Sequence, residues 1–166
     1  MTSRAPALRA AFAFFGAAVL AAAAIPVPVV MALEDQYGRP TELRVGVGRA
    51  VVAVVSPVRA AAEEISAWDE ALAGLPGGVD VYRIADLKAL PFFVPRGAVT
   101  KDLREKHGKT LLLLDWKGEV SAALGGPKRI TAVLVFGPDG MELGRVEGAA
   151  SLSGALKVKD LLARAR

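Results

Sequence analysis

The chain of 166 residues contains no cysteine. This absence excludes disulfides, thiolate nucleophiles and metal sites built on cysteine. Histidine is almost absent as well, since His107 is the single one, and aromatic residues make up 6% of the chain. No glycine-rich phosphate loop ending in Lys-Ser or Lys-Thr occurs, and no glycine-bearing calcium loop surrounds the acidic residues. We therefore expect neither a cofactor nor a metal ion.

A large excess of one charge is also missing. The 21 basic residues exceed the 17 acidic ones by a formal +4, and both signs alternate along the sequence instead of forming a basic stretch. That pattern is typical of a solvated surface and argues against nucleic acid as a partner. A hydrophobic content of 53% over this length suits one globular domain plus one extra segment.

The extra segment is the amino terminus. Arg4 and Arg9 precede residues 10–33, which carry no charge, and small residues around Ala32 offer a cleavage site. We expect residues 1–32 to be a signal peptide, and an uncleaved membrane anchor is the alternative, although two prolines near its outer end weaken that reading. Either way, the basic start predicts an exported chain, in the periplasm or on the outer face of the cytoplasmic membrane.

Residues 33–50 are interpreted as a polar lead-in with a turn at 37–40 and a short edge strand at 43–45. A domain is predicted over 51–166. Its first strand, 51–55, is a β-branched run typical of burial on both faces, and Ser56-Pro57 is interpreted as the N-cap and first-turn proline of the following helix.

Alternating apolar and helical patterns continue to the carboxyl end. Strands are expected at 79–84, 111–114, 131–136 and 142–146, and helices at 61–72, 100–106, 119–124 and 152–163. An Asp-Gly pair in the loop 137–140 favours a tight hairpin between the last two strands. Crossover helices followed by a terminal hairpin predict an α/β fold, with a mixed sheet flanked by helices.

Several motifs within residues 43–163 resemble the thioredoxin-like superfamily, particularly its peroxiredoxin-like and membrane-tethered branches. The run Leu-Leu-Leu-Leu-Asp at 111–115, with the short glycine-closed helix after it, is similar to the segment where those proteins end a strand at an aspartate. Val-Leu-Val-Phe-Gly-Pro-Asp-Gly at 133–140 looks like their last hairpin. Together with Phe-Phe-Val-Pro-Arg at 92–96, the order most resembles the YtfJ-type periplasmic proteins.

The resemblance implies a redox site that this chain does not have. The two cysteine positions of redox members fall near Val55 and Val58, and valine supplies no thiolate. The cis-proline before the hairpin strand corresponds to about Thr131, where a cis bond would cost about 2.5 to 4 kcal/mol, so a trans bond is expected. Thiol–disulfide exchange is thereby excluded.

What remains at this edge are candidate binding residues. Arg59 follows the Ser56-Pro57-Val58 turn at a helix amino terminus, where backbone amides favour anions. The resemblance places further cations near that turn, and a proline-bracketed aromatic pair could form a contact surface. The binding candidates are Ser56, Pro57, Val58, Arg59, Phe92, Phe93, Arg96, Lys128, Arg129 and Thr131. His107 is interpreted as a surface residue near the end of a short helix.

These observations favour a non-catalytic, exported binding or accessory module whose partner is a protein, a peptide or a small anion. Two alternatives stay open. One is an enzyme with non-thiol chemistry, hydrolase-like or peroxide-related, at the same edge, because a fold does not determine a function. The other is a membrane-anchored assembly partner.

Overall fold

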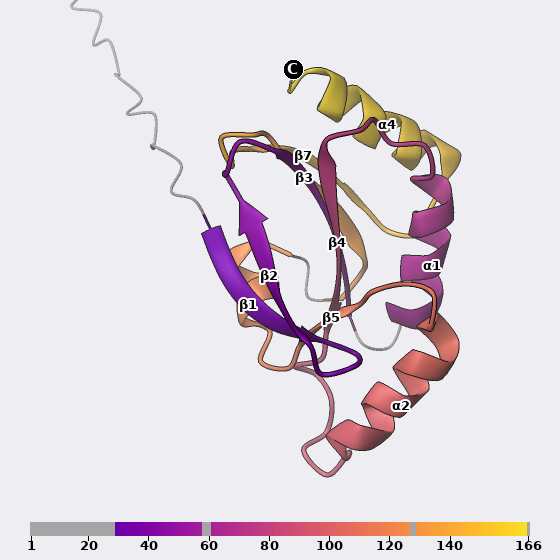
Figure 1. Ribbon diagram of the computed structural model, residues 1–166. Coiled ribbons are helices and arrows are strands. Elements are labelled where there is room, and N and C mark those ends of the chain that lie inside the picture. Colours follow the sequence, from indigo (N-terminus) through magenta and orange to yellow (C-terminus); the bar gives the residue numbers. More distant parts are fainter. Residues whose placement is uncertain (1–28, 58–60, 127–128, 166) are drawn as a thin grey trace, which may run out of the picture.

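A computed structural model describes residues 29–57, 61–126 and 129–165 of the chain (Figure 1). The elements run in the order β1 (Val29–Asp35), β2 (Pro40–Val45), β3 (Ala50–Pro57), α1 (Ala61–Ala71), β4 (Val79–Asp86), α2 (Arg96–His107), β5 (Leu113–Asp115), α3 (Glu119–Ala123), β6 (Ala132–Phe136), β7 (Glu142–Glu147) and α4 (Leu152–Ala163). From β3 onward this is the order that the sequence predicts.

The strands form one seven-stranded sheet in the order β2-β1-β5-β4-β3-β6-β7. Strands β3, β4 and β5 are parallel, and the other neighbouring pairs are antiparallel. The predicted mixed α/β sheet flanked by helices is confirmed. Strand β3 lies inside the sheet between β4 and β6, and its β-branched residues are buried on both faces.

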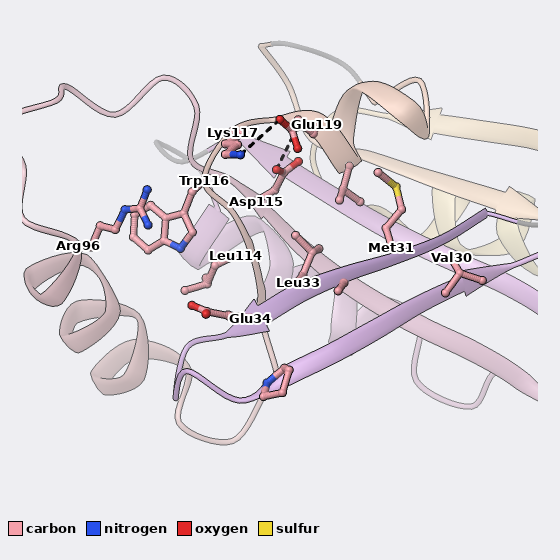
Figure 2. A pocket seen from close by; sticks show the side chains of 13 residues that line it. Val30, Met31, Leu33, Glu34, Arg96, Leu114, Asp115, Trp116, Lys117 and Glu119 are labelled. Carbon is pink, nitrogen blue, oxygen red and sulfur yellow. Dashed lines mark hydrogen bonds and ion pairs between the residues drawn. The ribbon is translucent and has the colours of Figure 1, made fainter.

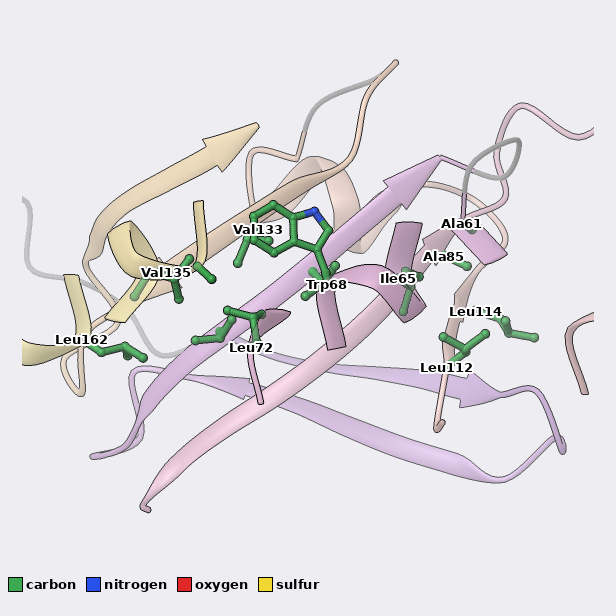
Figure 3. Packing of buried hydrophobic residues seen from close by; sticks show 14 of the residues in the cluster. Ala61, Ile65, Trp68, Leu72, Ala85, Leu112, Leu114, Val133, Val135 and Leu162 are labelled. Atoms are coloured by element: carbon green, nitrogen blue, oxygen red, sulfur yellow. The ribbon is translucent and has the colours of Figure 1, made fainter. Parts of the chain in front are cut away.

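Helices α1 and α4 pack on one face of the sheet, and Trp68 of α1 lies at the centre of that core (Figure 3). The Trp68 side chain is fully buried, and its Nε1 donates to the Gly148 carbonyl at 3.1 Å. Because this donor is satisfied, the indole can be buried without the cost of an unpaired polar group. The helical spacing of the apolar residues in α1 thus produces the packing that the sequence indicates.

The opposite face is covered by the β1–β2 hairpin and by α3 (Figure 1). Leu43 and Val45 of β2 are buried among residues of β3, β6 and α3, such as Val55 and Val120. The interpretation of residues 33–50 as a polar lead-in to a core that starts at 51 is therefore corrected: the sheet begins at Val29. Alternation hides this burial in the sequence, because every second residue of β2 faces solvent.

The hairpin is held to the rest of the fold by polar contacts at its turn. Asp35 is buried and accepts hydrogen bonds from the Tyr37 and Arg39 amides at 2.8 and 2.9 Å and from Arg39 Nε at 2.7 Å. Burial raises the pKa of Asp35, but the hydrogen bonds from Arg39 and Tyr37 outweigh it, so the net pKa lies below the ordinary value. Gln36 joins the turn to β5 by accepting from the Leu112 amide at 2.9 Å.

Local signals at the other end of the chain are also confirmed. The 137–140 loop closes with Gly140 at φ +85°, a left-handed conformation that glycine tolerates. Ser151 caps α4 by accepting from the Gly154 amide at 3.1 Å. Within the described ranges, no helix combines the length and the apolar character that crossing a bilayer requires.

Candidate functional site

Three parallel strands end together at one edge of the sheet. Pro57 at the end of β3 is in register with Asp86 at the end of β4, and Asp86 is in register with Asp115 at the end of β5. Carboxyl ends of parallel strands are the usual ligand-binding edge of α/β sheets, and the crevice forms where the strand order reverses. Here β4 and β5 lie on one side of β3 and β6 lies on its other side, so the reversal falls between β3 and β6.

At this reversal the structure brings together two residues that the sequence singles out, Ser56 and Thr131. Their hydroxyl oxygens are 2.6 Å apart, and both residues are fully buried. The pair is a hydrogen bond across the sheet between the end of β3 and the start of β6. Ser56 follows Val55, near which the resemblance places a cysteine, and Thr131 stands at about the position where it places the cis-proline.

The prediction that Ser56 caps the following helix is wrong. Ser56 and Pro57 belong to β3, and α1 begins at Ala61. The Ser56 hydroxyl instead forms a hydrogen bond with Thr131. The two residues lie far apart in the sequence, so a local pattern does not show this contact. The peptide bond before Thr131 is trans, as predicted, and the structure has no cis bond among the described residues.

A crevice of about 400 Å³ opens at Pro57, the last residue of β3. It is lined by Pro57, Asp86, Lys88, Ala89, Gly118, Ser121, Ala122 and Gly126. Asp86 accepts from the Lys88 amide at 3.0 Å, which fixes the loop after β4. The Ser121 hydroxyl is buried and has no hydrogen-bond partner among the described residues. The crevice therefore offers the Asp86 carboxylate and the Lys88 ammonium to a small polar ligand.

Asp115 positions α3, which lines the crevice with Ser121 and Ala122. The two carboxylate oxygens of Asp115 accept from the Glu119 amide at 3.1 Å and from the Ser121 amide at 2.7 Å, so Asp115 caps α3. Asp115 is not among the predicted binding residues. An aspartate between an apolar run and the start of a helix is a capping signal that could have indicated it.

The remaining predicted binding residues do not gather at the crevice. Phe92 and Phe93 are 99% and 72% exposed in the loop between β4 and α2, with their rings in an edge-to-face pair 5.7 Å apart. Arg96 stacks on Trp116, with 4.9 Å from the guanidinium carbon to the ring centroid. Arg129 is exposed. The candidates Val58, Arg59 and Lys128 lie outside the described residues, so the anion site predicted around Arg59 stays a prediction.

His107 is not the surface residue that the sequence suggests. It is 4% exposed, and its Nδ1 lies 3.1 Å from the Ser66 hydroxyl. Burial lowers the pKa of His107, and the nearby Lys106 charge lowers it further, while Asp69 acts in the opposite direction. The other ring nitrogen, Nε2, is buried without a partner among the described residues. Because no carboxylate hydrogen-bonds the imidazole, this serine and histidine lack the third group of a catalytic triad.

A second hollow lies on the hairpin side of the sheet (Figure 2). It encloses about 630 Å³ between β1, the residues after β5 and the start of α3. Arg96 and Trp116 stand at one end of it, Met31 and Val30 at the other. Of the seven predicted binding residues that the structure describes, Arg96 is the one that lines this hollow.

Comparison with known proteins identifies the fold. No family model matches the chain, and no curated protein sequence matches it. Among solved structures, it is similar to the exposed lipoprotein thioredoxin Etrx1 of Streptococcus pneumoniae, with 12% identity, a TM-score of 0.61 and coverage of 80% of this chain and 98% of that one.

Two further structures extend this likeness. A secreted disulfide oxidoreductase of Mycobacterium tuberculosis homologous to DsbE has 18% identity and a TM-score of 0.53, and covers 81% of this chain and 95% of that one. The peroxidoxin BcpB of Mycobacterium tuberculosis has 19% identity and a TM-score of 0.54, with coverage of 83% and 94%. The chain thus has the thioredoxin-like fold, as the sequence predicts, and it lacks the cysteine on which thiol–disulfide chemistry depends.

Proposed function

We propose that this chain is a non-catalytic binding module that holds a peptide, a protein or a small anion at the carboxyl edge of β3 and β4. The observation that carries the proposal is the crevice at the end of β3, where Asp86 and Lys88 line a space of about 400 Å³. Pockets of this size with a few convergent polar groups are typical of small-ligand sites.

Two features support binding over catalysis. Val55, near one former cysteine position, is fully buried in the hairpin-side core, so it supplies no reactive group. The Ser56 hydroxyl is buried and bonded to Thr131, while His107 is bonded to Ser66 on another part of the molecule. A nucleophilic serine needs a general base within hydrogen-bond reach, and Ser56 has none among the described residues.

We further propose that the module works outside the cytoplasm. The basic, then apolar, amino-terminal sequence supports export. The similarity to an exposed lipoprotein and to a secreted oxidoreductase agrees with that location.

The test combines activity assays with crosslinking on the purified domain. We expect no insulin reduction and no consumption of hydrogen peroxide. Envelope extract of the native host, crosslinked to the domain, is expected to yield a bound species that Ala122→Phe removes, because Ala122 lines the crevice and is exposed. Ala123→Phe is the matched control, since Ala123 is an exposed neighbour in α3 that does not line it.

Turnover of any tested substrate that Ser56→Ala abolishes would contradict the proposal. Equal capture by the Ala122→Phe and Ala123→Phe variants would place the ligand elsewhere and would contradict it as well.

A further inference from the structure

Strand β1 has a stretch of backbone with no strand beside it. In the hairpin, the Asp35 amide donates to the Arg39 carbonyl at 2.9 Å, so the backbone groups of Asp35 face β2. Successive residues of a strand point their backbone groups to opposite sides, so those of Val30, Ala32 and Glu34 face away from β2. The Glu34–Pro40 pairing agrees, because proline has no amide hydrogen to donate across the ladder.

Only Glu34 among these three residues has a neighbour on that side. The β1–β5 pairing comprises Glu34 with Leu114 and Asp35 with Leu113, and β5 ends at Asp115. The amides and carbonyls of Val30 and Ala32 are consequently unpaired among the described residues. Such an edge is a template on which another extended chain can pair.

This edge borders the 630 Å³ hollow (Figure 2). Met31, Leu33, Leu114 and Val120 contribute apolar side chains to it. Figure 2 shows the hollow running along β1, from Val30 and Met31 to Trp116. An extended chain added to β1 at Val30 and Ala32 would continue the line of β5 and lie in this hollow.

The end near Trp116 carries cationic groups. Arg96 is exposed and stacked on Trp116, and it pairs with no carboxylate among the described residues. Lys117 Nζ lies 3.7 Å from Glu119 Oε1, and both side chains are exposed to solvent. Glu34 and Asp115 also line the hollow, and the oxygens of Asp115 accept from the Glu119 and Ser121 amides. A stacked guanidinium is well suited to bind a carboxylate.

We infer that the hollow beside β1 binds an extended peptide, which adds a strand at Val30 and Ala32 and places a carboxylate against Arg96. The main chain of the ligand supplies the hydrogen bonds, and its alternate side chains enter the apolar hollow. This site is separate from the crevice at the carboxyl edge and does not depend on it. The carboxylate can come from an acidic side chain or from a peptide's carboxyl terminus.

The experiment titrates the ¹⁵N-labelled domain with synthetic hexapeptides of alternating valine and threonine. One peptide carries a single aspartate at its amino end, and the other carries it at its carboxyl end. Each is made with a free and with an amidated carboxyl terminus, and asparagine replaces aspartate in the control peptides. We expect amide shifts at Val30 and Ala32 with the acidic peptides. Loss of binding on amidation would assign the carboxylate to the terminus, and loss on the asparagine change would assign it to the side chain.

Two variants sharpen the test. Ala32→Pro removes an amide that β1–β2 pairing does not use, so the fold is retained while affinity falls by about tenfold. Arg96→Gln lowers affinity by up to about fivefold, the range of an exposed ion pair, and Lys101→Gln on the same helix leaves it unchanged. Circular dichroism checks the fold of each variant.

The inference is overturned if no peptide shifts the β1 amides of the wild-type domain, or if Ala32→Pro binds as tightly as the wild type. Shifts confined to Lys88 and Ser121 would overturn it too, while supporting the crevice proposed above.

Discussion

At the residue scale, two hydrogen bonds inside the fold involve side chains that are candidates for catalysis by residue type, a serine and a histidine. Ser56 bonds to Thr131, and His107 bonds to Ser66. Each contact joins residues distant in the sequence, and each is at least partly shielded from water. Both contacts are expected to contribute to stability, and both contributions can be measured.

The hydroxyl pair predicts a non-additive double-mutant cycle. Ser56→Ala and Thr131→Val each leave the other hydroxyl buried without its partner, so each lowers the free energy of unfolding by about 1 to 3 kcal/mol. The double variant is expected to be less destabilised than the two single losses added together, because no buried hydroxyl is left unpaired. Urea unfolding measures all four proteins, and strictly additive losses would show that the two hydroxyls do not interact.

His107 predicts a pH dependence of stability in the weakly acidic range. Because burial lowers its pKa from the ordinary 6.5, the unfolded chain binds the proton more readily than the folded one. The stability that His107 contributes is complete above pH 6.5. It is lost as the pH falls below 6.5 towards the pKa of His107 in the folded state. The unfolding free energy should therefore fall as the pH drops below the ordinary pKa of 6.5, and His107→Gln should flatten this slope. The pKa of Asp35 is also lowered, so its contribution to stability is likewise lost as the pH falls, but only at more acidic pH, below its ordinary 3.8.

At the scale of single elements, β1 has two roles. Its inner side chains, Val29, Met31 and Leu33, pack against the core, and its unpaired edge borders the hollow at Arg96. The strand begins at Val29, whereas the expected cleavage after Ala32 would remove its first four residues. Cleavage itself stays a prediction, but the strand constrains where a functional amino terminus can lie.

We predict that a chain beginning at Leu33 is less stable than one beginning at Val29. The shorter chain loses the ladder pairs of Met31 with Leu43 and Val29 with Val45, together with the apolar burial of Val29 and Met31. The expected loss is roughly 2 kcal/mol in the free energy of unfolding. Urea unfolding of the two purified chains measures it. Equal stability would mean that the first half of β1 does not contribute to the fold.

At the scale of the whole molecule, the two faces of the sheet are covered by different kinds of element. Helices α1 and α4 meet over one face, where Trp68 and Gly154 touch, and the β1–β2 hairpin with α3 closes the other. The carboxyl-edge crevice and the β1 hollow both border α3, since Ser121 and Ala122 line the first and Val120 the second. Packing of the layers thus sets the geometry of both proposed sites.

The α1–α4 contact predicts the effect of adding one methyl group. A Cβ at Gly154 would lie 2.7 Å from Trp68 Cη2, so Gly154→Ala should cost roughly 1 to 3 kcal/mol despite the better helix propensity of alanine. Gly97→Ala in α2 is the control, because nothing lies within 4 Å of its added Cβ, and it should be neutral or stabilising by up to about 1 kcal/mol. Thermal unfolding compares the two variants. A Gly154→Ala protein as stable as the Gly97→Ala protein would contradict this close packing.

The sequence by itself determined the parts of this protein that depend on local pattern. Periodicity, the Asp-Gly loop and the Ser151 cap indicated the order of elements from β3 onward, and the missing cysteine excluded thiol chemistry before any fold was known. These features rest on neighbours within a few residues along the chain. For that reason they can be inferred without coordinates.

Only the tertiary structure decided which of the candidate residues meet. It paired Ser56 with Thr131, buried His107 against Ser66, and separated Arg96 from the crevice by stacking it on Trp116. It also showed that the hairpin from Val29 onward covers one face of the sheet. Each of these facts depends on contacts between segments that the crossover connections bring together, and burial in such contacts is set by packing of the whole sheet, which no local sequence pattern encodes.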